Sequence, residues 1–428
     1  MVNIKSLTSS ESAFISSPIH INPNRQVLPN GLFLSSVKTK SNPPLHSISA
    51  SGIGFTKEES YLYTLGEYCE RYCASIISKS DTVRGSFLEL KEKDIPVLGM
   101  ENICMFSDDQ YSDESLRLTR VKESDSLLWV RGIDYVNEKE IYLPAFLVYL
   151  LSFNEKDKIY NISTTTGMSS HVNLGKAFNS AILENIERNA FVDFWYNQRH
   201  VDFIKYDRNV ILKSFPGDKR IKLLFDNRKV DYAVFDLTGH AVAETMLTIM
   251  FFEYKGRYIQ VAGCASRIGK REALIKSMME AYQSVNYAIN LFSSLNEKFK
   301  IIEKEWDFNL VDSFDCHFHF YNYFPSLRQK SPLISSALKP DEGVAENLVY
   351  DNKKITEISR EELVRNGVSD IFYVDLTTPD VKQIGNSVIK VLTPQLAPLT
   401  AIHKYPFLGG SNFKNRNDLF TEYPHLFP

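Results

Sequence analysis

The chain has 428 residues, 43% of them hydrophobic and 24% charged, and its formal net charge at pH 7 is -3. This length and composition can bury a large core, as one large domain or as two to three ordinary ones, and the mixed charge gives no reason to expect a nucleic-acid partner. The N-terminus lacks the apolar core of a signal peptide, and the longest apolar run, AFLVYLL from Ala145, is far shorter than the roughly 20 residues that cross a bilayer. We therefore expect a cytoplasmic protein with no membrane partner.

The first half of the chain predicts strands around two long helices. Residues 1–50 are rich in Ser, Thr, Asn and Pro, and they predict an N-terminal region of short strands and loops ahead of a main domain that we place at 51–428. The expected elements are helices at about 57–78 and 174–197 and strands at 127–136 and 141–151.

The second half predicts paired strands and a third long helix. Alternating and apolar runs bounded by turn residues are typical of strands. The expected strands lie at 229–238, 244–254, 257–265, 313–324, 370–377 and 387–396, and the expected helix lies at about 270–294.

The first helix carries an acidic triplet. In the stretch TLGEYCERY, Glu67, Glu70 and Arg71 are spaced at i, i+3 and i+4, which places them within an arc of about 100° on one helix face. Taken alone, this pattern favours a solvated face opposite an apolar stripe.

The same triplet recurs on the second helix as Glu184, Glu187 and Arg188. Here Phe191 and Trp195 extend the acidic face, so the helix is apolar nearly all round and is expected to be buried. Buried carboxylates need a cation or hydrogen-bond partners, so the second triplet indicates a functional site.

The third helix adds Lys276, Glu280 and Gln283 at i, i+4 and i+7 of one face. Three such helices could converge on one polyanion and its metal. Mg²⁺ binds through a few carboxylates together with substrate phosphates, while Arg and Lys contact phosphate oxygens directly. A Mg²⁺-nucleotide is the ligand that suits this set best.

Two familiar motifs do not supply the site. In GCASRIGKR, five residues separate Gly263 from Gly269, and Arg271 stands where a phosphate-binding loop needs Ser or Thr. His317 and His319 share a face of the expected strand 313–324, but further ligands at zinc spacing are lacking. We therefore expect a nucleotide site that is not a P-loop.

Several separate motifs, in the right order, resemble the YcaO-like ATP-dependent family. The resemblance covers most of the chain and is carried by SGIGFTKEESYLYTLGEYCERY, RGIDYVNEKEIYLPAFLVYL, TTTGMSSHVNLGKAFNSAILENIERNAF, AGCASRIGKREALIKSMMEAYQS, SDIFYVDLT and IKVLTPQLAP. It implies an α/β fold with mixed, largely antiparallel sheets packed with long acidic-faced helices, and a non-P-loop site for ATP and Mg²⁺.

The resemblance also implies roles for the acidic helices. It makes the five glutamates metal or phosphate-site ligands and the other four residues polar contacts to the nucleotide. The glutamates are Glu67, Glu70, Glu184, Glu187 and Glu280, and the polar contacts are Arg71, Arg188, Lys276 and Gln283. The chain departs from its relatives at Ile53, where lysine is common, and at Lys176, where an acid is usual.

The resemblance is to the azoline-forming members of the family, which are cyclodehydratases of modified-peptide biosynthesis. In their reaction a Cys, Ser or Thr side chain of a precursor peptide attacks the preceding carbonyl, ATP phosphorylates the amide oxygen, and phosphate leaves. Their proline-rich tail carries a terminal carboxylate into the site for proton transfer. The matching tail here is Pro424 to Pro428, so the resemblance implies a catalytic role for Pro428.

The resemblance implies partners as well. These are the precursor peptide, a leader-binding ThiF-like protein with the ubiquitin-activating fold, and a flavin-dependent azoline dehydrogenase, while a homodimer stays open. Thioamide or amidine formation by the same ATP chemistry, and a nonenzymatic ATP-binding accessory, are the alternatives.

Overall fold

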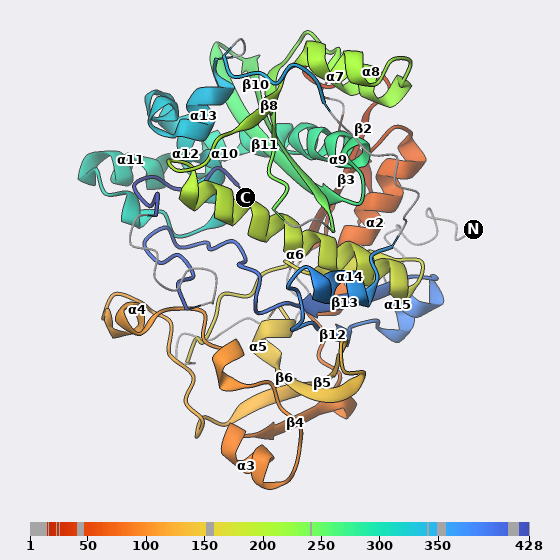
Figure 1. Cartoon of the computed structure of the whole chain (residues 1–428), viewed down its shortest axis with the longest axis vertical. Coiled ribbons are helices and arrows are strands. Elements are labelled where there is room, and N and C mark those ends of the chain that lie inside the picture. Colours follow the sequence, from red (N-terminus) through yellow and green to blue (C-terminus); the bar gives the residue numbers. More distant parts are fainter. Residues whose placement is uncertain are drawn as a thin grey trace.

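The computed structural model describes residues 15, 17–22, 24, 26–40, 47–150, 158–239, 242–339, 342–348, 357–409 and 419–427. Within these residues the strands form three sheets, in which neighbouring strands are antiparallel. Long helices pack across and between the sheets (Figure 1). The structure therefore has the mixed α/β class with antiparallel sheets that the sequence predicts.

The first sheet has the order β1-β2-β3 and packs against helix α2. Its strands are β1 (His20–Ile21), β2 (Phe33–Lys38) and β3 (Ser49–Gly54), and α2 spans Lys57–Ala74. The hydroxyl of Thr56 caps α2 by accepting a hydrogen bond from the Glu59 amide at 3.1 Å. A Cβ at Gly52 would lie 2.4 Å from the Thr64 amide nitrogen, so glycine is what lets β3 approach the helix this closely. The helix ends at Ala74, before the expected residue 78.

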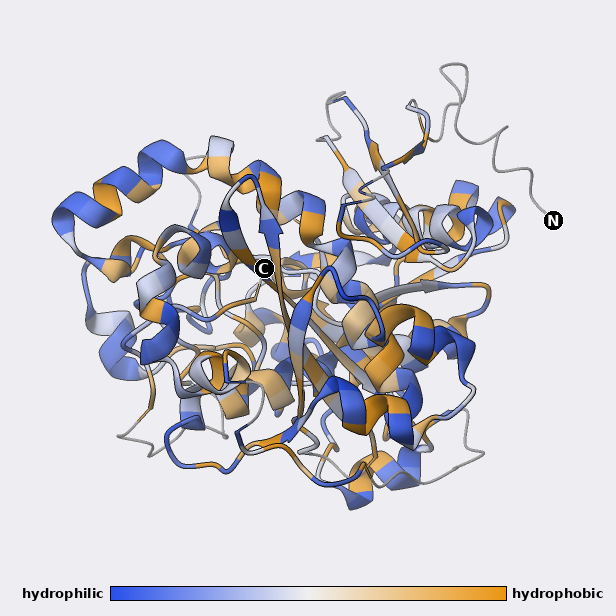
Figure 2. Ribbon diagram, turned by 90° about the horizontal axis from the view of Figure 1, so that it is seen from above, coloured by the Kyte–Doolittle hydropathy of each residue, from blue (hydrophilic) through white to orange (hydrophobic). Residues whose placement is uncertain are grey.

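The second sheet has the order β11-β10-β9-β8 and is buried on both faces. Its strands are β8 (Ile204–Tyr206), β9 (Asp231–Asp236), β10 (Glu244–Tyr254) and β11 (Arg257–Arg267). Along β10, Met246 and Met250 lie in one core cluster, whereas Leu247 and Ile249 lie in another. Successive side chains of a strand point to opposite faces, so β10 separates two cores. In Figure 2 the ribbons at the centre of the view carry hydrophobic (orange) stretches beside hydrophilic (blue) ones.

Helix α9 (Lys270–Gln283) covers one face of the second sheet. A Cβ at Gly263 of β11 would lie 2.1 Å from the Ser277 carbonyl oxygen, so a side chain there would push the helix off the sheet. The expected helix at 270–294 is two helices, because α10 (Val285–Ser294) begins after a break at Ser284.

The third sheet joins segments from distant parts of the chain. Its order is β4-β5-β12-β13-β7, with β6 also paired to β5. The strands are β4 (Thr82–Gly85), β5 (Leu127–Asp134), β6 (Lys139–Pro144), β7 (Met168–His171), β12 (Phe372–Asp375) and β13 (Ser387–Leu392). The expected strand at 141–151 is correct only as far as Pro144, because the next residues form the short helix α5 (Ala145–Val148).

Helix α6 (Leu174–Asn197) runs through the middle of the molecule and has the bounds that the sequence predicts (Figure 1). It packs on β13 and β7 of the third sheet and on β11 of the second. It is buried almost all round, and even Glu187 is only 4% exposed. The helix therefore carries its charges into the interior.

The expected strand at 313–324 is wrong, because these residues form helix α12 (Phe314–Tyr323). The Ser313 hydroxyl caps the helix, and a short, fully buried apolar run has no periodicity that separates helix from strand. Side chains two apart point to nearly opposite sides of a helix, so His317 and His319 share no face. The ring of His317 stacks on His425 at 3.7 Å between centroids, and His319 packs edge-on against Phe292.

The remaining helices are shorter. They are α3 (Phe87–Glu92), α4 (Asp108–Ser112), α7 (Arg208–Ser214), α8 (Lys219–Phe225), α11 (Asn296–Glu305), α13 (Pro332–Ala337), α14 (Arg360–Arg365) and α15 (Pro379–Gln383). In the part of the chain that the structure describes, no helix is both long enough and apolar enough to cross a membrane.

Candidate active site

Carboxylates from α2, α6 and α9 meet in one partly buried region. Burial raises the pKa of Glu70 well above its usual value, and the nearby charges of Glu184 and Glu67 raise it further. Burial also raises the pKa of Glu187 to about 8, with Glu280 and Glu184 adding to the shift. Like charges shift one another's pKa in this way at short range, so the three helices bring these groups into one site.

Four of these carboxylates are held by backbone amides of neighbouring strands and loops. Each amide nitrogen donates to one carboxylate oxygen. The pairs are Ser51 to Glu67 at 2.8 Å, Ser170 to Glu70 at 2.7 Å, Gly167 to Glu184 at 3.1 Å, and Ser266 to Glu187 at 3.3 Å. Hydrogen bonds of this kind fix the direction of each carboxylate and leave other lone pairs for a ligand.

Arg188 is the central cation of the region. Its guanidinium lies 3.5 Å from Glu184 and 3.7 Å from Glu187. Burial alone would lower the pKa of Arg188, but the charges of Glu187, Glu184 and Glu280 raise it overall. The guanidinium therefore stays charged inside the protein, where it can contact an anionic ligand.

The other basic groups pair within their own helices. Arg71 lies 2.7 Å from Glu67, and Lys276 lies 3.3 Å from Glu280. The Arg71 Nε atom is buried and has no hydrogen-bond partner among the described residues. A buried donor without a partner fits a site that binds an anion.

Gln283 joins α9 to the first sheet. Its side-chain amide donates to the hydroxyl of Ser51 at 2.9 Å and to the Ser51 carbonyl at 3.3 Å, while the Ser51 amide donates to Glu67. The residue thus lies beside the acidic region, bound to Ser51 within β3.

The donor set fits Mg²⁺ and a nucleotide together. Glu187 is buried, Glu70 and Glu184 are half-buried, and all three have raised pKa values, so the positive charge nearby is too small to offset the desolvation of their ionised forms. Within the described ranges, no three His, Cys, Asp or Glu side chains converge tightly enough to hold a metal by themselves. Mg²⁺ commonly binds through one or two carboxylates and takes its other ligands from phosphates and water, so these two observations are compatible.

Lys390 is a site residue that the sequence patterns did not single out. It lies in β13, is 3% exposed, and donates through Nζ to the carbonyls of Thr164 at 3.0 Å and Thr166 at 2.6 Å. Burial lowers the pKa of Lys390 to about 8, and the nearby Glu184 opposes that shift. A single charge inside the apolar strand SVIKVL is the signal that could have found it.

The C-terminal segment reaches the same region. Pro428 lies outside the described residues, so the predicted role of its carboxylate stays a prediction. Phe427 is 3% exposed, its ring centroid lies 5.2 Å from the guanidinium carbon of Arg188, and its ring packs on Phe191. The residue before Pro428 therefore contacts the central cation.

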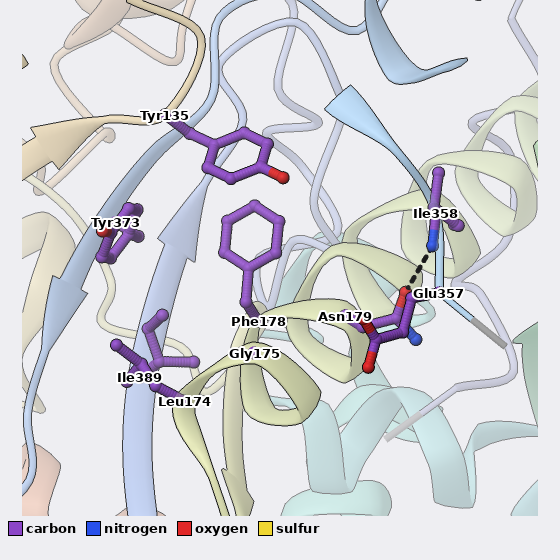
Figure 3. Close-up of a pocket in the computed structure, with 9 residues that line it drawn as sticks. All are labelled: Tyr135, Leu174, Gly175, Phe178, Asn179, Glu357, Ile358, Tyr373 and Ile389. Carbon is purple, nitrogen blue, oxygen red and sulfur yellow. Dashed lines mark hydrogen bonds between the residues drawn. The ribbon is translucent and has the colours of Figure 1, made fainter. Parts of the chain in front are cut away.

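A hollow of about 200 Å³ lies on the other side of α6 (Figure 3). Aromatic rings of Tyr135, Phe178 and Tyr373 line it, and the Asn179 side chain accepts a hydrogen bond from the Ile358 amide. Phe178 is nine residues before Glu187, which places the two on opposite faces of the helix. This hollow is therefore separate from the acidic site.

A family model described as "YcaO cyclodehydratase, ATP-ad Mg2+-binding" matches residues 51–397. The chain belongs to the YcaO family. Its cofactors are ATP and Mg²⁺, as the resemblance implied. No curated protein matches the sequence significantly.

Solved structures have the same fold. A chain of the microcin synthetase McbBCD complex of E. coli is 18% identical with a TM-score of 0.60, and the match covers 91% of this chain and 90% of that one. YcaO from Methanopyrus kandleri bound with AMPPCP and Mg²⁺ is 14% identical with a TM-score of 0.54, covering 89% and 85%. A heterocyclase in complex with substrate and cofactor is 18% identical with a TM-score of 0.65, covering 90% and 51%. The chain thus spans about half the length of that heterocyclase.

Proposed function

We propose that this YcaO protein carries out ATP-dependent cyclodehydration of Cys, Ser or Thr residues in a ribosomally made precursor peptide. The products are thiazolines or oxazolines. The single observation that carries the proposal is the convergence of carboxylates from α2, α6 and α9 in one region, with Arg188 beside Glu184 and Glu187. The family match and the similarity to heterocyclase folds support it.

In this proposal the five carboxylates hold Mg²⁺ or orient the nucleotide, and Glu67 also pairs with Arg71. The five are Glu67, Glu70, Glu184, Glu187 and Glu280. Bound ATP supplies a phosphoryl group that turns the amide oxygen into a good leaving group. Arg188 and Lys276 stabilise negative charge in the region, because both are cations already placed beside the carboxylates. Glu187 is only 4% exposed, whereas the side chains of Glu67, Glu184 and Glu280 are 25–27% exposed.

The tail completes the proposed site. Contact between Phe427 and Arg188 supports a position of Pro428 near the reacting groups. A carboxylate there would be ionised at neutral pH, because its reference pKa is about 3.5, and it could accept a proton from the attacking side chain.

We also propose that the chain works with other proteins. One delivers the precursor through a ThiF-like leader-binding fold, and a flavin-dependent dehydrogenase oxidises the azolines. The similarity to a chain of the McbBCD complex supports a multi-protein assembly. Binding of the leader by a partner would convert an encounter with the core peptide into a positioned reaction.

The test is mass spectrometry of the precursor after incubation with the protein, its co-encoded partners, ATP and Mg²⁺. The expected product has lost one water per ring, together with stoichiometric release of ADP and phosphate. Exchange of oxygen for sulfur would instead assign thioamide formation. An unchanged peptide in the complete mixture, with no nucleotide consumed, would contradict an enzymatic role and favour the accessory function.

A further inference from the structure

A cavity of about 80 Å³ lies between α6, the loop before β7 and the segment after β13. Some of its lining residues are apolar, and others carry hydroxyl or amide groups. The residues that define it include Leu98, Phe146, Ser163, Lys390, Thr393 and Leu396. On this measure a water molecule needs about 10–15 Å³, so the cavity has room for several waters or for one small organic group.

The cavity adjoins the acidic site directly. Asn185, which lines it, follows Glu184 in α6, and the same short loop that carries Ser163 ends at Gly167, whose amide donates to Glu184. Lys390 lines the cavity and is close enough to Glu184 for the carboxylate to raise its pKa. A group bound here would therefore reach the carboxylates that hold the nucleotide in the proposed function.

Two hydroxyls in the cavity wall have no partner. The Ser163 Oγ and Thr393 Oγ1 atoms are buried, and neither makes a hydrogen bond within the described part of the chain. Most buried polar side-chain atoms in proteins are bonded, and an unsatisfied one costs about 1–3 kcal/mol. Two such groups in one cavity indicate a ligand that can both donate and accept.

The chemistry of the wall selects an uncharged, amide-like ligand. Lys390 is its one cation among the described lining residues, and two of its three protons are given to the Thr164 and Thr166 carbonyls. That leaves one N–H of a single cation for a ligand, whereas a phosphate is usually held by several donors. A purine usually stacks on a ring, yet Phe146, alone among these residues in being aromatic, already packs on Tyr160. A peptide group with a small side chain matches both the hydroxyls and the apolar wall.

We propose that this cavity is the subsite for the residue of the peptide substrate that undergoes modification, with Ser163 and Thr393 hydrogen-bonded to its backbone. This inference rests on the proposed function for its placement beside the nucleotide, but peptide binding itself can be measured separately.

The test uses the blocked dipeptide acetyl-glycyl-serine methylamide at millimolar concentration as the probe. Binding to the wild-type chain and to the double variant Ser163→Ala/Thr393→Val is followed by saturation-transfer NMR. We expect the double variant to bind the probe about tenfold or more weakly, since each lost neutral hydrogen bond is worth about 0.5–1.5 kcal/mol. Its melting temperature should stay the same or rise, because the free protein loses no partner for either hydroxyl.

Thr39→Val is the matched control. The Thr39 hydroxyl is buried directly after β2 and accepts a hydrogen bond from the Ile48 amide at 3.0 Å, so its removal should lower the melting temperature and leave probe binding unchanged. A general loss of packing would weaken probe binding in both proteins.

The outcomes separate this inference from the proposed function. Equal probe binding by the wild type and the double variant, or no binding by either, overturns the subsite and shows that water alone fills the cavity. Weaker binding of Mg²⁺-ATP by the double variant, with probe binding unchanged, overturns it in favour of the nucleotide base. Selective loss of probe binding upholds it even if no precursor is ever cyclised, in which case the proposed function alone fails.

Discussion

At the scale of single residues, the acidic site contains carboxylates whose desolvation costs folding stability. Glu70, Glu184 and Glu187 all have raised pKa values, with burial as the largest cause. Each is partly compensated by one backbone amide and, on α6, by Arg188. Residues placed at a cost to stability are typical of sites that act on a ligand.

We expect Glu187→Gln to reduce Mg²⁺-ATP turnover by at least about 100-fold, because it removes one hard-oxygen ligand and a charge at the centre of the site. The amide oxygen can still accept from Ser266, so the melting temperature of the free protein should not fall. Both are measured on purified protein beside Glu342→Gln, which alters an exposed ion pair with Lys339. Normal turnover in a folded Glu187→Gln protein would remove Glu187 from the assignment.

The raised pKa of Glu187 also predicts a pH dependence. Its reference pKa is 4.5 and its pKa in the fold is about 8. The folded state therefore binds this proton more tightly than the unfolded state does, and the stability that protonation provides is lost as pH rises from 4.5 through 8. Buried histidines also make the free energy of unfolding depend on pH at the acid end. The informative quantity is therefore the difference in free energy of unfolding between wild type and Glu187→Gln.

That difference is obtained from urea unfolding at a series of pH values without nucleotide. We expect the free energy of unfolding of wild type to decline relative to Glu187→Gln between about pH 4.5 and 8. Parallel curves across this window would show that Glu187 titrates normally in the folded chain.

At the scale of elements, the long helices were predictable and their packing partners were not. The helical period of the sequence predicts α6 with its observed bounds and places Glu184 and Glu187 on one face. It cannot say that Ser170 and Gly167, at either end of β7, supply the amides for Glu70 and Glu184, because that contact depends on strand order in the third sheet. Lys390 could have been noticed as the one charge in the apolar run SVIKVL, but its position near Glu184 depends on the same strand order.

The failure at α12 has a different cause. A run such as SFDCHFHFYNYF is apolar at almost every position, so neither helical nor strand periodicity is visible in it. The structure buries most of α12 among the second sheet, α10 and the C-terminal segment, where a helix can be apolar on every side. The ring of His317 stacks on His425 of that segment and does not share a face with His319.

The C-terminal segment offers a test at this scale. We expect Phe427→Ala to lower turnover by about tenfold, because a partly desolvated cation–π contact such as that with Arg188 is worth about 1–2 kcal/mol. Phe420→Ala is the matched control, since Phe420 is equally buried in the same segment but packs on Arg199. Both changes should cost about 3–5 kcal/mol of folding stability.

Kinetics above KM for ATP, at a temperature where both variants are folded, separate the two effects. A selective loss of kcat in Phe427→Ala assigns the segment to the site. Equal kcat values in the two variants would limit its role to stability.

At the scale of the whole molecule, the acidic site is where the three sheets are joined. In the first sheet, Ser51 of β3 is hydrogen-bonded to both Gln283 and Glu67. In the second sheet, β11 supplies the amide that binds Glu187, and in the third sheet, β7 supplies the amide that binds Glu70. The helices α2, α6 and α9 carry the matching side chains. The groups proposed to bind one ligand are therefore distributed over every layer of the fold, and ligand binding should stabilise all of them together.

This arrangement predicts a large and strictly cooperative stabilisation by Mg²⁺-ATP. A ligand that binds the folded chain alone adds about 2.7 kcal/mol at 100 times its Kd, and it should raise the melting temperature of the whole described fold in a single transition. ATP with EDTA should give little shift, because without the metal the triphosphate meets five carboxylates. Calorimetry with Mg²⁺ alone, ATP with EDTA, and Mg²⁺-ATP measures the three cases, with Glu187→Gln as the variant in which the Mg²⁺-ATP shift should be lost. A shift of equal size with ATP and EDTA would show that the carboxylates hold no metal, and two separate transitions on Mg²⁺-ATP addition would show that the sheets are not joined through this site.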